Sequence, residues 1–137
     1  MIPRYSLPEM SAVWSDNNRF QKWLDTEVAA CEAMTDLGII PPEALEQIKG
    51  KAAFDIDRIN EIEQVTRHDV LAFLTCVAEN VGGASKYIHL GLTSSDVLDT
   101  SLAVQLKEAC ELIITRLEKL RAAVAAKAVE HKYTLMI

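Results

Sequence analysis

The stretch that decides the fold reads SSDVLDTSLAVQLKEACELIITRLEKLRAAVAAKAVEH and covers residues 94–131. Neither glycine nor proline occurs between Leu92 and Ile137, so nothing in this part of the chain interrupts a helix. Apolar residues recur here in steps of three and four, which predicts one α-helix of about 38 residues, roughly 57 Å long. The apolar positions are Leu106, Ala109, Ile113, Leu117, Leu120, Val124 and Ala128.

The predicted helix is longer than a compact domain of this chain's own size. A globule of 137 residues has a diameter of about 37 Å, well below the length of the helix. We therefore expect helices from other subunits, or from sequence outside this chain, to cover the apolar stripe. Because the chain stops inside the apolar run Tyr133–Ile137, we interpret it as a truncated piece of a longer protein. The seam of the contact is predicted to be Leu106, Ile113, Leu117, Leu120 and Val124.

The residues before this stretch also follow a helical period, and no segment alternates as a strand would. The predicted fold is therefore all-α, with a small N-terminal helical domain over residues 1–93. Residues 94–137 are predicted to be the first long helix of a central helical bundle, truncated at its end. Shorter helices are expected from Pro8 to Trp14, over 17–37 after a cap at Asp16, from Pro42 to Lys49, after a cap at Asp55, and over 70–81.

The composition excludes several classes of function. The chain carries 20 acidic and 14 basic residues, a net charge of −6, and residues 1–93 hold 14 of the acidic and 8 of the basic ones. An acidic chain without a run of Lys and Arg is a poor binder of nucleic acid. No uncharged stretch exceeds nine residues, and the N-terminus lacks the pattern of an export signal. We expect a cytoplasmic protein that binds neither nucleic acid nor membrane.

Cysteines and aromatic residues are expected to serve the core. Three cysteines, Cys31, Cys76 and Cys110, are odd in number and widely spaced, which favours buried thiols over a disulfide framework or a zinc site. The helical spacing of the aromatic residues predicts one core cluster, composed of Trp14, Phe20 and Trp23.

Two predicted helix starts share a pattern that suits an anion. Thr66-Arg-His-Asp69 and Thr93-Ser-Ser-Asp96 are both Thr-x-x-Asp, a shortened capping box in which Thr is the N-cap. A helix start presents free backbone N–H groups and the positive end of the helix dipole. Arg67 and His68 add a fixed cation and a titratable group to the first start. Together the two starts would form a cradle for a carboxylate or phosphate.

A structural interpretation of the same residues stays open at this point. Caps of this kind occur on most helices and usually serve only the fold. A histidine at a helix start, such as His68, is more often a surface or capping residue than a catalyst. His89 lies in a short linker and equally fits a satisfied, half-buried histidine, whereas His131 lies at a helix end and is assigned no chemistry.

Several motifs together resemble the bacterial adenylosuccinate lyase family, in register over residues 1–137. The Thr-Ser-Ser-Asp segment alone indicates only the wider superfamily of fumarase, aspartase and argininosuccinate lyase. The Arg-Tyr start and the Arg-His-Asp motif narrow the resemblance to the purine enzymes. The motifs are Arg4-Tyr5-Ser6-x-Pro8-Glu9-Met10, Trp14, Thr66-Arg67-His68-Asp69-Val70 and His89-x-Gly91-Leu92-Thr93-Ser94-Ser95-Asp96-Val97-x-Asp99-Thr100.

The resemblance implies a lyase of purine biosynthesis. Members of this family eliminate fumarate from adenylosuccinate to give AMP, and from a succinylated aminoimidazole carboxamide ribotide. A base removes the proton β to the departing nitrogen, and an acid protonates the leaving amine. The family uses no metal and no organic cofactor, and its members are homotetramers in which the long helices of four subunits form a central bundle.

The resemblance also assigns roles to residues. Arg4 and Tyr5 are implied to contact the phosphate and ribose of the nucleotide. Arg67, His68 and Asp69 are implied to bind substrate beside the reaction centre, with His68 as a catalytic residue that assists the acid. Thr93 and Ser94 are implied to bind the succinyl group. A multiply negative substrate of this kind suits helix starts with a few isolated cations rather than a globally basic surface.

Two parts of the family's catalytic machinery do not occur in this chain. The Gly-Arg-Thr-His-Gly motif, which carries the principal general-acid histidine, is expected immediately after Ile137, and the flexible loop with the serine base is absent. The chain alone is therefore expected to lack lyase activity. Two alternatives remain open, a lyase of the same superfamily with another succinyl or amino acid substrate, and a non-catalytic helical oligomerisation module.

Overall fold

The structure is a computed structural model that describes residues 2–135. Every regular element in this range is a helix, which confirms the all-α prediction. The elements are η1 (Pro3–Tyr5), α1 (Pro8–Val13), α2 (Asp16–Asp36), α3 (Pro42–Lys51), α4 (Ile56–Thr66), α5 (Asp69–Val81), η2 (Gly82–Tyr87) and α6 (Ser94–Glu130). None of these helices is long and apolar enough to cross a membrane.

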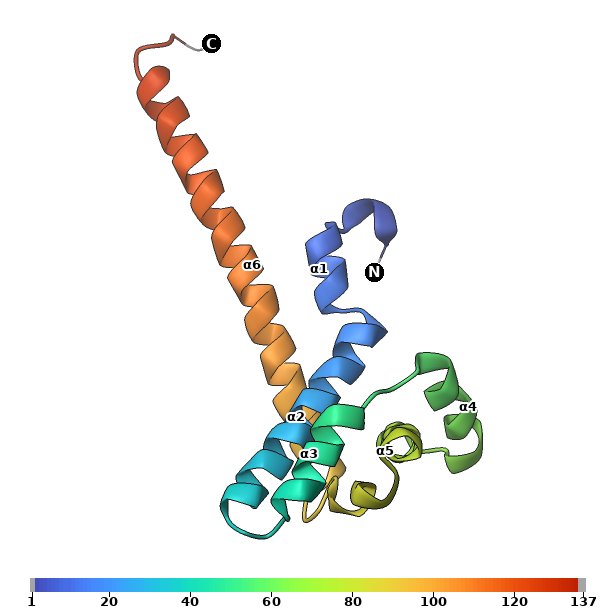
Figure 1. Ribbon diagram of the computed structural model, residues 1–137. Coiled ribbons are helices and arrows are strands. Elements are labelled where there is room, and N and C mark those ends of the chain that lie inside the picture. Colours follow the sequence, from blue (N-terminus) through green and yellow to red (C-terminus); the bar gives the residue numbers. More distant parts are fainter. Residues whose placement is uncertain (1, 136–137) are drawn as a thin grey trace.

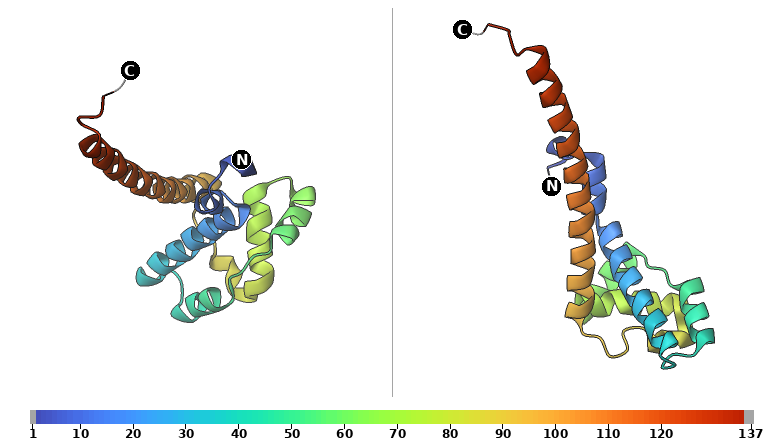
Figure 2. Two further views of the ribbon diagram at one scale, coloured as in Figure 1. Left: turned by 90° about the horizontal axis from the view of Figure 1, so that it is seen from above. Right: turned by 90° about the vertical axis from the view of Figure 1, so that its left-hand side faces the viewer.

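The long helix predicted from the sequence is present as α6, with 37 residues from Ser94 to Glu130. Its first half packs against α1 and α2, and its second half projects beyond the shorter helices (Figure 1). Figure 2 shows the same projection from two further sides. The predicted seam residues are between 49% and 59% exposed, so nothing within residues 2–135 covers the stripe. The four buried residues of α6 are Val97, Ser101, Gln105 and Ala109.

The core lies among α2, α3, α4 and α5. Phe20 stacks on Phe73 with ring centroids 5.8 Å apart, and Trp23 meets Phe73 edge-on at 5.5 Å. The prediction that Trp14 joins this cluster is wrong, because its side chain is 40% exposed. Trp14 is the C-cap of α1, where the chain turns before α2 begins, and it therefore falls outside the helical period that Phe20 and Trp23 share.

Helix caps follow the predictions in part. Asp55 caps α4 as expected, since its side chain accepts a hydrogen bond from Arg58 N. The cap of α2 is Ser15 rather than Asp16, which is the first helical residue instead. The Ser15 hydroxyl accepts from Asn18 N at 3.2 Å, so it takes the position that we assigned to the carboxylate.

Polar contacts fix the first half of α6 against α2. The buried Ser101 hydroxyl donates to Lys22 O at 3.0 Å and lies 3.0 Å from the Thr26 hydroxyl. Lys22 pairs with Glu108 at 2.6 Å, and this contact lowers the pKa of Glu108. These contacts hold α6 against α2, because Lys22 and Thr26 on one face of α2 contact two positions of α6 that lie two turns apart.

The cysteines agree with the prediction at two of three positions. Cys31 and Cys76 are buried, but Cys110 is exposed on α6, so the expectation of a buried thiol is wrong there. Cys110 follows the buried Ala109 and falls on the side of α6 that faces away from α2. Burial, with the nearby charge of Glu27, raises the pKa of the Cys31 thiol to about 11, so this thiol is unreactive at neutral pH.

Candidate functional site

The start of α5 differs from the predicted cap. Thr66 is the last residue of α4 rather than an N-cap, and Arg67 adopts a left-handed conformation at φ 53° that separates the two helices. His68 is the N-cap of α5, and its Nδ1 accepts a hydrogen bond from Leu71 N at 3.2 Å. A ring nitrogen thus replaces the hydroxyl that the Thr-x-x-Asp pattern predicts. Arg67 and His68 flank this helix start directly, and its N–H groups at Val70 and Leu71 already donate to Asp69 and His68.

This capping role determines the tautomer of His68. Because Nδ1 accepts an N–H, the proton of the neutral ring is on Nε2. The Asp69 carboxylate is 3.6 Å from Nδ1 and accepts instead from Val70 N at 2.7 Å. His68 is exposed, so Nε2–H is available as a hydrogen-bond or proton donor to a ligand. This is the form that a histidine assisting an acid requires.

The start of α6 has the predicted capping box. Asp96 accepts from Thr93 N at 2.7 Å and from the Thr93 hydroxyl at 2.9 Å. These two hydrogen bonds, with a smaller effect of the charge of His89, lower the pKa of the Asp96 carboxyl. Within the described range, no group accepts a hydrogen bond from the N–H of Ser94 or of Ser95. These two donors, together with the Ser94 hydroxyl, can bind a carboxylate oxygen.

The third predicted group lies in η1. The Arg4 guanidinium donates to the Tyr5 hydroxyl at 3.0 Å and lies over the Tyr5 ring, 4.7 Å from its centroid. Both side chains are exposed. The pair therefore presents a cation and a phenol side by side, which suits a phosphate ester but does not by itself require one.

The structure brings the predicted residues together within three separate groups. These groups are Arg4 with Tyr5, Arg67 with His68 and Asp69, and Thr93 with Ser94. Among residues 2–135, no hydrogen bond or ion pair joins one group to another. A single pocket that uses all three groups therefore stays a prediction. No group of three or more His, Cys, Asp or Glu residues within the described range could hold a metal ion.

A pair that the sequence did not reveal lies next to the start of α6, where α2 meets the linker before Thr93. Glu27, on α2, is 1% exposed, and its Oε1 is 2.6 Å from Nδ1 of His89. The two residues are 62 positions apart, so no local pattern links them. One signal was available in the sequence, since Glu27 falls on the apolar face of the helix, one turn after Trp23 and one turn before Cys31.

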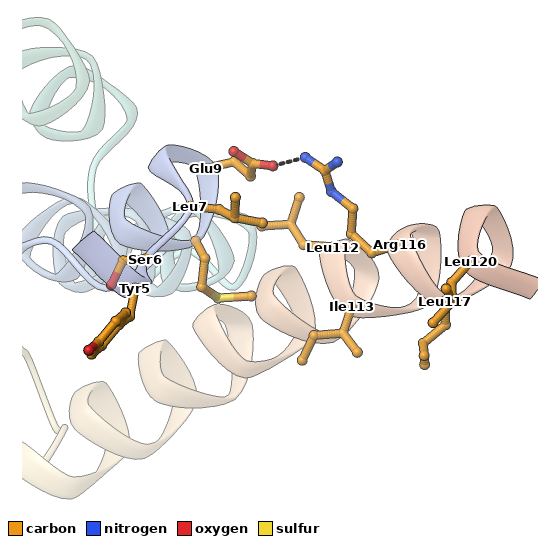
Figure 3. Close-up of a pocket in the computed structure, with 10 residues that line it drawn as sticks. Tyr5, Ser6, Leu7, Glu9, Leu112, Ile113, Arg116, Leu117 and Leu120 are labelled. Carbon is orange, nitrogen blue, oxygen red and sulfur yellow. Dashed lines mark hydrogen bonds and ion pairs between the residues drawn. The ribbon is translucent and has the colours of Figure 1, made fainter. Parts of the chain in front are cut away.

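An apolar pocket of about 380 Å³ lies between the N-terminal segment and α6. Figure 3 shows Leu7 next to Leu112, with the ion pair of Glu9 and Arg116 beside them. Of the predicted site residues it includes only Tyr5. Its lining continues along the exposed stripe of α6, so it belongs to the uncovered face rather than to the helix starts. Its lining residues are Tyr5, Ser6, Leu7, Glu9, Met10, Leu112, Ile113, Arg116, Leu117 and Leu120.

This geometry defines an all-helical protein in which exposed charged and hydrogen-bonding groups lie at the starts of α5 and α6. Residues 4–137 match a protein family described as "Lyase", and the chain belongs to this lyase family. It is 56% identical over 137 residues to the adenylosuccinate lyase of Synechocystis sp. and 52% identical to that of Bacillus subtilis. Both similarities cover 100% of this chain, which spans 32% of the length of either relative.

Solved structures agree with this family. The fold is similar to that of a fumarate lyase from Mesorhizobium sp. BNC1, with a TM-score of 0.82 and 30% identity over 88% of this chain and 29% of the other. It is also similar to a 3-carboxy-cis,cis-muconate lactonizing enzyme from Pseudomonas putida, with a TM-score of 0.85 and 28% identity over 92% of this chain and 30% of the other.

Proposed function

We propose that the full-length protein containing this chain is an adenylosuccinate lyase. The observation that carries the proposal is the identity of 56% and 52%, over the whole chain, to two relatives of that name. The enzyme would eliminate fumarate from adenylosuccinate to give AMP, and from the succinylated aminoimidazole carboxamide ribotide. It would therefore act in purine biosynthesis, in the cytoplasm.

In this proposal the three groups divide the substrate among them. Arg4 and Tyr5 bind the phosphate and ribose, and the N–H groups and hydroxyl at the start of α6 bind the succinyl carboxylates through Thr93 and Ser94. Arg67 and Asp69 bind substrate beside the reaction centre. His68 assists protonation of the leaving amine, for which its exposed Nε2–H is suited. The proton on the neighbouring carbon is removed by a base that lies outside these residues.

We also propose how this chain relates to the assembled enzyme. Residues 1–93 would form a small helical domain, and residues 94–137 would contribute the first long helix of a central bundle. The exposed stripe of α6 supports a homotetramer in which long helices of several subunits cover each other. The chain alone would lack activity, because the general acid and the base of the family lie outside it.

The proposal is tested with the purified full-length protein and a small panel of substrates. Fumarate release is measured from adenylosuccinate and from argininosuccinate, a substrate of another branch of the superfamily. We expect kcat/KM at least about 100-fold higher for adenylosuccinate, because a site built for the nucleotide leaves polar groups unpaired with other substrates. Equal rates would favour the related lyase, and no turnover of either would favour the oligomerisation module.

A matched pair of variants tests whether Arg67 binds the nucleotide substrate. Arg67→Gln in the full-length protein is expected to raise KM for adenylosuccinate about tenfold or more, because it removes a cation from an anion site. Arg121→Gln removes an exposed cation from the last third of α6 and is expected to leave KM unchanged. Equal KM values in the two variants would contradict the assignment of Arg67.

A further inference from the structure

Both oxygens of the Glu27 carboxylate contact the same residue, His89. Besides the contact of Oε1 with the ring of His89, its Oε2 accepts from the backbone N–H of His89 at 2.9 Å. Glu27 is 1% exposed and lies on the α2 face of Trp23 and Cys31, against the linker that precedes α6. Burial of a carboxylate is costly unless its oxygens find hydrogen-bond donors, and here one residue supplies a donor to each oxygen.

His89 itself has an unusual backbone conformation. Its φ is 63°, in the left-handed region that non-glycine residues rarely adopt. The linker is also held one turn further along α2, where the Cys31 thiol donates to Tyr87 O at 3.7 Å. A turn alone would be served by glycine, as at Gly91 with φ 73°, without any buried charge. The combination of histidine and buried glutamate therefore calls for a reason beyond the turn.

The pair orients the imidazole ring. A carboxylate oxygen accepts hydrogen bonds, so the short contact assigns a proton to Nδ1 and leaves Nε2 as the free position. The His89 side chain is 21% exposed, so the ring is not sealed in the core. His89 O accepts from Leu92 N at 3.3 Å, and Leu92 directly precedes Thr93, the N-cap of α6, so the linker that carries the ring runs straight into the first turn of α6.

We propose that Glu27 is a positioning residue of the lyase site, which fixes the tautomer of His89 and holds its ring beside Thr93 and Ser94. This inference rests on the proposed function, since it assigns the pair to the binding of the same substrate. Glu27 acts only through His89 and touches no ligand. A residue that orients another in this way affects rate or affinity without contributing a contact of its own.

The test compares Glu27→Gln with Glu32→Gln in the full-length protein. Both changes remove a carboxylate from α2, but Glu32 pairs with Lys49 on the surface. In Glu27→Gln the amide N–H₂ donates to Nδ1, so the His89 proton moves to Nε2. We expect this change in the ring ¹⁵N spectrum of histidine-labelled protein, with His89 assigned by its loss in His89→Asn. We also expect kcat/KM to fall about tenfold or more, and Glu32→Gln to match the wild type.

Glu27→Asp keeps the charge and is expected to retain a proton on Nδ1, with kcat/KM between the other two values. The proposal is overturned if the tautomer changes in Glu27→Gln while kcat/KM equals that of Glu32→Gln, or if the wild type lacks a proton on Nδ1. Should Glu27→Gln not fold, the wild-type spectrum and the kinetics of Glu27→Asp decide alone. Failure of the proposed function is recognised separately, because the wild type would then release no fumarate.

Discussion

At the scale of the residue, His68 combines two properties that a variant can separate. Its Nδ1 caps α5, and its Nε2–H is free for a ligand. Asparagine is a good N-cap, so His68→Asn keeps the first property and removes the second. We expect kcat of the full-length protein to fall about 100-fold or more, the usual effect of losing a general acid, while Tm changes little.

The control for this prediction is His131→Asn. His131 lies at the end of α6, where no chemistry is assigned, and this variant should retain the wild-type kcat. Steady-state fumarate release and thermal unfolding are measured for both variants. Wild-type turnover in His68→Asn would show that His68 only caps α5 and would support the structural interpretation of this residue.

A second prediction at this scale concerns Asp96 and pH. Hydrogen bonds from Thr93 lower the pKa of Asp96 in the folded chain. The folded pKa lies below the unfolded value of about 3.9, so the stability that Asp96 contributes is present above that value and is lost as the pH falls through the folded pKa. Asp96→Asn should therefore lower Tm at pH 7, and the difference from wild type should shrink below about pH 4.

Thermal unfolding at pH 7 and pH 3 measures this effect. Asp99→Asn, an exposed carboxylate in the next part of the same helix, is the control and should show no comparable dependence. A Tm difference for Asp96→Asn that is constant with pH would contradict the role of its charge in the cap.

At the scale of the element, the contact of α2 with α6 depends on buried polar groups. Ser101 is 0% exposed and joins Lys22 O and the Thr26 hydroxyl. Ser101→Ala leaves its two half-buried partners with one contact fewer, which typically costs about 0.5–1.5 kcal/mol of the free energy of unfolding. Thr115→Ala removes an exposed hydroxyl that bonds only within α6, and should change stability by less than about 0.5 kcal/mol.

Denaturant unfolding, followed by circular dichroism, measures both variants. Equal midpoints for Ser101→Ala and Thr115→Ala would mean that the hydrogen bonds of Ser101 do not help to hold α6 against α2.

The elements differ in how far the sequence predicts them. The start of α6 at Ser94 was predictable because a capping box precedes a long stretch without glycine or proline, and both signals are local. The cap of α5 was predicted wrongly because a histidine ring can accept the same N–H as a threonine hydroxyl, and rules based on residue type rank threonine first. The pair of Glu27 and His89 joins distant parts of the chain, and only the tertiary packing of α2 against the linker brings them together.

For the candidate site, too, the sequence predicts what is local and does not predict contacts between distant parts of the chain. The motifs identify Arg67, His68 and Thr93 as exposed residues at helix starts, and the structure places them there. Whether the starts of α5 and α6 serve one pocket depends on contacts that no residue pattern within this chain encodes. Burial, tautomers and hydrogen bonds could be assigned only once the helices were placed in space.

At the scale of the whole molecule, the main surface that residues 2–135 leave uncovered is the apolar stripe of α6. The second half of α6 extends beyond the other helices (Figure 1), and the apolar side chains of the stripe are exposed. An apolar face of this length is covered in a stable protein, and the proposed homotetramer supplies the cover. Leu117 lies in the middle of the predicted seam and is 56% exposed here.

Leu117→Glu in the full-length protein should therefore dissociate the assembly, because a carboxylate buried among apolar side chains lacks any partner. Ala122→Glu is the matched control, since Ala122 lies on another face of α6, about 140° around the helix from Leu117. Size-exclusion chromatography with light scattering should give a smaller particle for Leu117→Glu and the wild-type mass for Ala122→Glu, with equal helical content in both. If the wild type is a tetramer and Leu117→Glu keeps its mass, the seam does not lie on this face, and the stripe must be covered from within the same subunit.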